Sequence, residues 1–104
     1  MISVYLDGVK DLLYPRKKGV LSSKNKAILV NEVSVYSKED IKKLRLRLSL
    51  SHALFAKVMN VSEKTVEFWE SGHSVPSGSA MRLLCMLEHY PDILLETDTV
   101  ELAE

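Results

Sequence analysis

Residues 49–76, SLSHALFAKVMNVSEKTVEFWESGHSVP, contain two helix signals separated by a tight turn. Ser51 is suited to cap a first helix over residues 52–59, because its hydroxyl can accept a hydrogen bond from the first turn. Leu50 and Phe55 have the spacing of a hydrophobic staple, which fixes how the chain enters a helix. The sequence therefore predicts that a helix starts immediately after Ser51.

The second helix has equally clear limits. Asn60 tolerates the left-handed backbone conformation that a turn after the first helix needs. Ser62 can then cap a helix over residues 63–71, and Gly72 is the residue type that most often ends a helix. The sequence therefore predicts a helix, a short turn and a second helix.

The second helix is predicted to have one buried face and one free face. Val66 and Trp69 are its core anchors. Four residues share the free face: Glu63, Lys64, Glu67 and Phe68. Two helices joined by a tight turn, with a free face on the second, form the architecture that places a recognition helix in a DNA groove.

Capping signals predict further helices on both sides of this pair. Ser37 and Asp40 form a capping-box-like start to a preceding helix, and Ser77 can cap a following one. The predicted fold is mostly α-helical, with five helices over residues 37–48, 52–59, 63–71, 78–89 and 93–95. The helical domain would then span residues 37–95, followed by an acidic tail over residues 96–104.

Residues 1–36 are predicted to form an N-terminal arm outside the helical domain. Within the arm, residues 26–36 are the best strand candidate, because four positions are β-branched: Ile28, Val30, Val33 and Val35. A solitary strand leaves its backbone unpaired, so it would need the earlier segment, a second copy of the chain or a partner protein. The alternative is an arm that folds back on the helical domain.

The composition is that of an ordinary soluble domain with an arm, since the chain has 104 residues, 46% apolar and 27% charged. The apolar runs are far too short to span a bilayer, and no secretory signal is recognisable at the N-terminus. A lone cysteine, Cys85, excludes an internal disulfide and fits a reducing cytosol. We therefore expect a cytoplasmic protein with no membrane partner.

The net charge of zero hides an uneven distribution of charge along the chain. Residues 1–36 hold six Lys/Arg against three Asp/Glu, residues 37–90 hold eight against six, and residues 91–104 hold none against five. A phosphate-facing surface needs local positive charge and not a basic chain. Because the helical domain is only weakly basic, we expect modest and salt-sensitive affinity for each DNA half-site.

The helical region resembles the Xre/Cro-type, or lambda-repressor-like, helix-turn-helix family. Its signatures are Ser-polar-x-x-Phe-Ala over residues 51–56, Val-Ser-x-x-Thr-Val over residues 61–66 and Trp-Glu-x-Gly over residues 69–72. The flanks, Tyr-Ser-x-x-Asp-Ile-x-x-Leu-Arg over residues 36–45 and Pro-Ser-Gly-x-Ala-x-x-Leu-Leu over residues 76–84, resemble HigA-type antitoxins of bacterial toxin–antitoxin pairs. The resemblance covers residues 36–95 and does not extend to the first 35 residues.

The first turn of the second helix points at base edges in this docking mode, so Glu63 and Lys64 are the leading candidates for base contact. Lys64 can donate to O6 and N7 of guanine. Glu63 can accept from N4 of cytosine, or it can simply complement the helix dipole. Phe68, one turn further on, can contact a thymine methyl group or serve as a packing residue.

A second set of residues is predicted to contact DNA phosphates. Ser62 and Thr65 lie where the hydroxyl and backbone N–H groups of a helix N-terminus meet phosphate, although Ser62 can serve as a cap alone. His52 aligns with a glutamine that this family places on a phosphate. Three residues after the recognition helix can bond the DNA backbone or form an ordinary polar loop: Ser71, His73 and Ser74.

The resemblance also implies a structural ion pair between Arg45 and Glu70. This pair would tie the first helix of the domain to the end of the recognition helix. Breaking a buried ion pair typically costs about 3–5 kcal/mol. The pair would therefore influence both stability and the angle of the recognition helix.

No residue pattern indicates catalysis, a metal ion or a cofactor. The histidines lack metal-ligand spacing with Cys85, and no carboxylate pair or nucleophile motif stands out. The helix over residues 78–89 is apolar nearly all round, which indicates burial on more than one side. Its extra apolar surface predicts a dimer contact through Met81, Cys85 and Met86. The position of Cys85 inside an apolar helix favours a core residue over a reactive thiol.

The resemblance implies a homodimeric repressor that binds a palindromic operator in double-stranded DNA. It further implies an antitoxin that autoregulates its operon and neutralises a ribonuclease toxin of the RelE/HigB type. The arm is then the region for toxin binding or dimer exchange. Two alternatives remain: a stand-alone or phage-type regulator without a toxin, and a protein-interaction module built on the same fold. None of these functions requires a small-molecule substrate.

Overall fold

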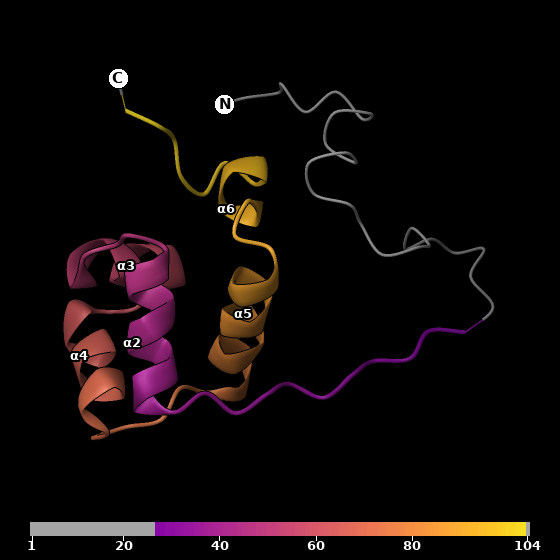
Figure 1. Cartoon of the computed structure of the whole chain (residues 1–104), viewed down its shortest axis with the longest axis horizontal. Coiled ribbons are helices and arrows are strands. Elements are labelled where there is room, and N and C mark those ends of the chain that lie inside the picture. Colours follow the sequence, from indigo (N-terminus) through magenta and orange to yellow (C-terminus); the bar gives the residue numbers. More distant parts are fainter. Residues whose placement is uncertain (1–26, 104) are drawn as a thin grey trace. The chain divides into compact units, whose positions relative to one another are not determined.

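The computed structural model describes residues 27–103, and the chain from Val33 onward forms one compact unit. Five helices follow one another in the described part of the chain: α2 (Lys38–Arg47), α3 (His52–Met59), α4 (Glu63–Ser71), α5 (Gly78–His89) and α6 (Ile93–Glu96) (Figure 1). They confirm the five predicted helices, whose ends differ by at most one residue from the prediction. None of these helices is long and apolar enough to cross a membrane.

Each of the four longer helices begins at a serine that caps it. Each serine hydroxyl oxygen accepts a hydrogen bond from the backbone N–H group three residues further on. The pairs are Ser37 with Asp40 at 3.1 Å, Ser51 with Leu54 at 3.1 Å, Ser62 with Thr65 at 3.0 Å and Ser77 with Ala80 at 3.2 Å. Asp40 completes a capping box by accepting from the Ser37 N–H at 3.0 Å, which lowers the pKa of the Asp40 carboxyl. Because caps satisfy N–H groups that a helix leaves unpaired, they define where each helix starts.

Two residues with left-handed backbone end α3 and α4. Asn60, the C-cap of α3, has φ 58° and ψ 46°, a conformation that its short polar side chain tolerates. Gly72, the C-cap of α4, has φ 84°, which glycine adopts without strain because it lacks Cβ. The predicted turn after α3 and the predicted end of α4 are therefore both confirmed.

The core lies between α2, α3, α4 and α5, and α4 packs against both α2 and α3. All four helices contribute fully buried side chains: Ile41, Phe55, Val66, Leu84 and Leu87. Trp69 of α4 is 4% exposed, so both predicted core anchors of α4 are confirmed. Removing this apolar surface from water provides the main driving force for the fold.

Contacts at Glu88 hold α5 beside α2. The hydroxyl of Tyr36, which directly precedes the α2 cap, donates to Glu88 Oε1 at 2.6 Å. Arg47, at the end of α2, donates to the Glu88 carbonyl at 2.8 Å. Burial, together with the hydrogen bond to Glu88, raises the pKa of the Tyr36 hydroxyl above its usual range, so the phenol keeps its proton. The last residue of the predicted arm therefore belongs to the helical unit.

The predicted strand over residues 26–36 is not confirmed. Residues 27–37 contain no strand, and the described part of the chain has none elsewhere. The β-branched residues of this segment indicate strand propensity, but a strand forms only where another strand supplies hydrogen-bond partners. The rest of the predicted arm, residues 1–26, lies outside the described residues.

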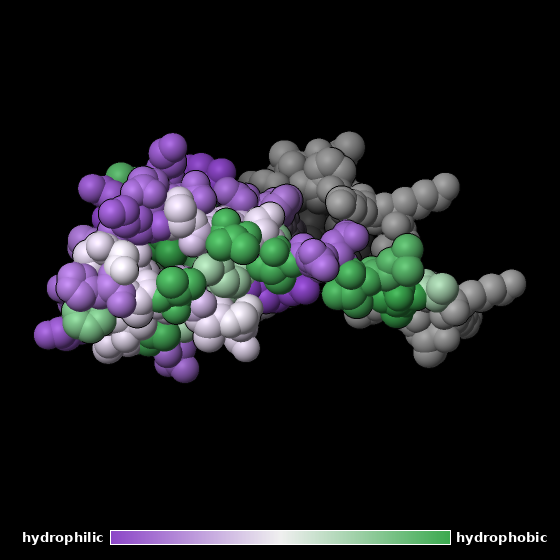
Figure 2. Space-filling model, turned by 90° about the horizontal axis from the view of Figure 1, so that it is seen from below, coloured by the Kyte–Doolittle hydropathy of each residue, from purple (hydrophilic) through white to green (hydrophobic). Residues whose placement is uncertain are grey.

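A shallow apolar pocket of about 260 Å³ opens where the chain enters α2. Its lining includes Trp69, Pro76 and two exposed valines, Val35 and Val75, which are 84% and 74% exposed. Figure 2 shows the molecule from below the view of Figure 1. On this lower side, hydrophobic surface, in green, lies among hydrophilic surface. The volume lies below the roughly 300–1,000 Å³ that is typical of small-molecule pockets.

Candidate nucleic-acid interface

α4 has the two faces that its sequence predicts. Val66 and Trp69 point into the core, with exposed fractions of 0% and 4%. The opposite face is exposed and carries Glu63, Lys64, Glu67 and Phe68. A second helix with such a free face is what a helix-turn-helix presents to base edges in the major groove.

Phe68 contacts two neighbours on this exposed face. The His73 ring stacks on the Phe68 ring with the centroids 5.2 Å apart and an interplanar angle of 22°. Lys64 Nζ lies 5.5 Å from the centroid of the Phe68 ring, within the range of a cation–π interaction. We call this arrangement the Lys64–Phe68–His73 column. The Phe68 ring is therefore flanked by Lys64 and His73 on the exposed face of α4.

Two predicted phosphate contacts lie together at the N-terminus of α4. Ser62 Oγ and Thr65 Oγ1 are 2.7 Å apart, and Ser62 Oγ also accepts from the Thr65 N–H. The N-terminus of a helix carries a partial positive charge and unpaired N–H groups, which attract phosphate. Ser62 and Thr65 therefore lie together at the capped N-terminus of α4, and their contact with phosphate stays a prediction.

The predicted phosphate contacts at the end of α4 and after it have different surroundings. Ser71 Oγ donates to the Phe68 carbonyl at 3.2 Å and lies 2.9 Å from His73 Nδ1. Ser74 lines the apolar pocket beside Trp69. The structure thus joins Ser71 to the Phe68 backbone and to His73, stacks His73 on the Phe68 ring, and places Ser74 at the pocket.

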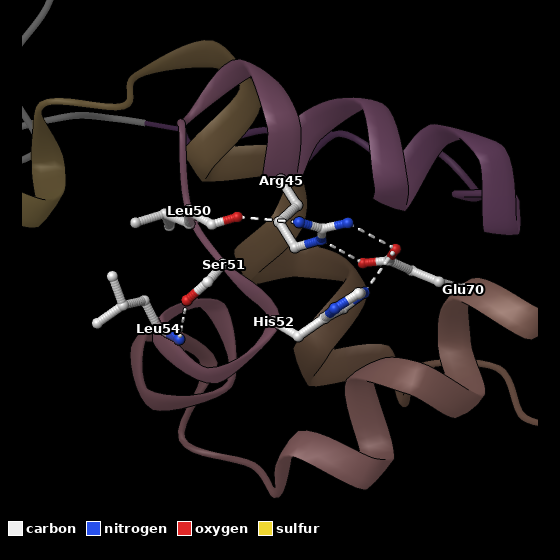
Figure 3. A network of polar contacts seen from close by, with 6 residues as sticks. All are labelled: Arg45, Leu50, Ser51, His52, Leu54 and Glu70. Atoms are coloured by element: carbon white, nitrogen blue, oxygen red, sulfur yellow. Dashed lines mark hydrogen bonds and ion pairs between the residues drawn. The ribbon is translucent and has the colours of Figure 1, made fainter.

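Arg45, Glu70 and His52 form a polar network that joins α2, α3 and α4 (Figure 3). Arg45 donates through Nε to Glu70 Oε2 at 2.7 Å and through Nη2 to Oε1 at 3.1 Å. Its Nη1 donates to the Leu50 carbonyl at 3.0 Å. The side chains of Arg45 and Glu70 are each 8% exposed. The structure therefore contains the ion pair that the family resemblance implies, in a buried and bidentate form.

The network keeps the Glu70 carboxylate charged. Burial by itself would raise the pKa of this carboxyl, but hydrogen bonds from Arg45 and His52 and the charge of Arg45 outweigh burial and lower it. Since Glu70 belongs to the last turns of α4, its bonds to Arg45 fix α4 against α2.

His52 lies at the first position of α3 and contacts the same carboxylate. Its Nε2 is 3.2 Å from Glu70 Oε1, and its side chain is 41% exposed. The contact joins residues 18 positions apart, so it depends on how α3 packs on α4. The sequence motifs did not reveal this contact or the bond to the Leu50 carbonyl. Both were hidden because they involve a tertiary approach or a backbone acceptor.

The three predicted dimer residues of α5 have different degrees of burial. Met81 is 8% exposed and belongs to the core, Cys85 is half-buried, and Met86 is 47% exposed. Cys85 Sγ lies 3.7 Å from His89 Nδ1. Among residues 27–103, no group of three or more His, Cys, Asp or Glu side chains is arranged to hold a metal ion.

Part of the helical region is similar to known proteins. Residues 41–87 match the helix-turn-helix family. The chain is also 35% identical over 65 residues to Antitoxin HigA-2 of Vibrio cholerae serotype O1, in an alignment that covers 62% of each protein. The aligned part is thus less than two thirds of that relative. Both findings confirm the resemblance that the motifs of residues 36–84 indicate.

Proposed function

Since residues 41–87 carry a helix-turn-helix domain, we propose that this protein is a sequence-specific DNA-binding repressor and the antitoxin of a toxin–antitoxin pair. In this proposal α4 is the recognition helix and enters the major groove, while α3 crosses the DNA backbone. Two copies form a homodimer and bind a palindromic operator with half-sites about one helical turn, ~34 Å, apart. The protein represses its own operon and neutralises a ribonuclease toxin of the RelE/HigB type.

The exposed face of α4 is the observation that carries the DNA-binding proposal. Lys64 is exposed there and can donate to O6 and N7 of guanine. The hydroxyls of Ser62 and Thr65 lie at the capped N-terminus of the same helix, where phosphate is attracted. A base donor within two residues of two hydroxyls at a helix N-terminus is a combination that fits the edge of the major groove.

Two observations support the antitoxin part of the proposal. The relative that shares 35% identity with this chain is itself an antitoxin. Ile28, Leu29 and Val30 of the arm are 57%, 91% and 78% exposed, and consecutive exposed apolar side chains are typical of segments that become buried in a protein partner. We therefore assign the arm without Tyr36, residues 1–35, to toxin binding or to exchange between two copies of the chain.

We expect the purified protein to bind DNA from upstream of its own gene with an affinity that falls as salt is raised. Lys64→Ala should weaken this binding about tenfold or more, since a lost base contact typically costs ~1–3 kcal/mol. Fluorescence anisotropy at two salt concentrations measures both effects.

The matched control is Lys42→Ala, which removes an exposed lysine from α2 instead of α4. It should weaken binding only slightly. Equal losses for Lys42→Ala and Lys64→Ala would contradict a base contact by Lys64. If the purified protein binds its upstream DNA no more tightly than random DNA, the proposal that it represses without a partner is contradicted.

Removal of residues 1–32 is expected to leave operator binding unchanged and to abolish binding of the toxin encoded next to the gene. The reason is that the compact unit begins at Val33, so the deletion spares the recognition helix and its supports. Co-purification of the truncated protein with the neighbouring gene product, beside an anisotropy titration, measures both properties. Lys64→Ala is the reciprocal control, because it should lose DNA and keep the toxin. Loss of folding in the truncated protein would overturn the assignment of the arm.

One specific observation favours a second function, a protein-interaction module. Glu63 and Glu67 are exposed on the free face of α4, where acidic side chains repel phosphate. This function would be supported if the chain binds a protein partner with an affinity that salt does not lower and does not bind DNA. The neighbouring gene distinguishes a stand-alone regulator from an antitoxin. A neighbouring gene that encodes a small basic ribonuclease-like protein favours the antitoxin.

A further inference from the structure

We propose that the Lys64–Phe68–His73 column reads a guanine and a nearby thymine as one unit. In this unit Lys64 contacts the guanine, Phe68 contacts the 5-methyl group of the thymine, and His73 is a positioning residue that holds Phe68. The inference rests on the proposed DNA-binding function and adds the class of sequence that α4 selects.

The spacing of the column fits neighbouring base pairs. Lys64 and Phe68 are four residues apart on α4, so they share a face and are separated by about 6 Å along the helix axis. Base pairs are stacked about 3.4 Å apart. The two side chains therefore reach base pairs that are one or two steps apart.

The chemistry of Phe68 matches a single feature of the major groove. Its ring is apolar and 38% exposed, and it contacts Lys64 and His73 in the absence of DNA. The thymine methyl is the apolar group that the major-groove edges of the four bases offer. Burying the methyl against an ordered ring removes apolar surface from water without a large entropy cost.

His73 is fixed from two sides, which makes it a support for Phe68. Its backbone N–H donates to the Phe68 carbonyl at 2.9 Å, after the left-handed turn at Gly72 has brought the chain back over α4. Its ring Nδ1 lies 2.9 Å from Ser71 Oγ, which in turn donates to the same carbonyl. The imidazole is thereby held flat against the Phe68 ring, as the 22° interplanar angle shows.

Replacing thymine by deoxyuridine tests the inference, because it removes only the 5-methyl group and keeps base pairing. The probe is a duplex selected from random DNA by the full-length protein, remade with one thymine at a time replaced by deoxyuridine. The wild-type protein should lose about fourfold in affinity at one thymine of a half-site, the value expected for one buried methyl-sized group. That thymine should lie within two base pairs of a guanine at which Lys64→Ala loses its preference.

Three variants locate the effect in the column. Phe68→Ala should bind the thymine and deoxyuridine duplexes equally, and His73→Ala should retain only part of the difference because the ring remains but is no longer held. Leu46→Ala removes a side chain that is 56% exposed from α2 and should keep the full fourfold difference. Thermal unfolding of each variant checks that it is folded.

The possible failures are distinguishable. If the wild-type protein prefers its selected duplex to random DNA but is indifferent to every deoxyuridine, the inference is overturned and the proposed function stands. Sensitivity to deoxyuridine that persists in Phe68→Ala overturns the assignment to Phe68. Selection that recovers no preferred duplex overturns the proposed function and the inference together.

Discussion

Replacing Glu70 with alanine is expected to lower the free energy of unfolding by about 3–5 kcal/mol, a large part of the stability of a small domain. The guanidinium of Arg45, on a side chain that is 8% exposed, would lose both of its bonds to the carboxylate. The guanidinium would keep its hydrogen bond to the Leu50 carbonyl. Its buried positive charge would no longer have a counter-charge. Urea unfolding followed by circular dichroism near neutral pH measures this loss.

Two further variants separate the ion pair from a simple change of charge. Glu67→Ala removes the same charge from an exposed position of the same helix, and it should change stability by no more than about 0.5 kcal/mol. The double change Arg45→Met with Glu70→Leu removes both charges and should recover much of the loss, because apolar replacements of buried ion pairs are often neutral. If Glu70→Ala proves as mild as Glu67→Ala, the ion pair does not support the fold.

Phe55→Ala is the second change with a large expected effect, a loss of about 3–5 kcal/mol in the free energy of unfolding. Phe55 is 0% exposed and is among the largest fully buried side chains of the core. Alanine would remove most of the buried ring and leave a cavity that the surrounding helices fill only in part. Since α3 supplies the surface on which α4 packs, we expect operator affinity to fall when the variant is partly unfolded.

The neighbouring residue provides the control for this change. Leu54 is 51% exposed on the same helix, so Leu54→Ala should cost far less than Phe55→Ala. Urea unfolding of the two variants under the same conditions gives the comparison. Similar costs for both would mean that Phe55 is not a principal core residue, contrary to its burial.

The sequence determined the helices and their ends, because these features depend on residues close together in the chain. Serine caps bond to groups three residues away, so Ser37, Ser51, Ser62 and Ser77 mark the starts of four helices. Asn60 and Gly72 mark two ends because few residue types accept a left-handed backbone. Helical periodicity likewise assigned Val66 and Trp69 to the core and Phe68 to the exposed face.

The strand predicted for residues 26–36 shows where such local reasoning stops. β-branched residues such as Val33 and Val35 favour the extended backbone of a strand, but this preference produces a strand only when a second strand lies alongside. The described residues of the arm form no strand. A local pattern could not establish this, since the pairing partner is a property of the tertiary or quaternary structure.

Only the tertiary structure decided which side chains of the candidate site contact one another. The family resemblance implies that Arg45 meets Glu70, but the contact of His52 with the same carboxylate depends on the approach of α3 to α4. The stack of His73 on Phe68 likewise depends on the path of the chain after Gly72. Such contacts are set by distances of a few ångströms between elements, and hydrogen bonds and ring stacking fall off steeply over that range.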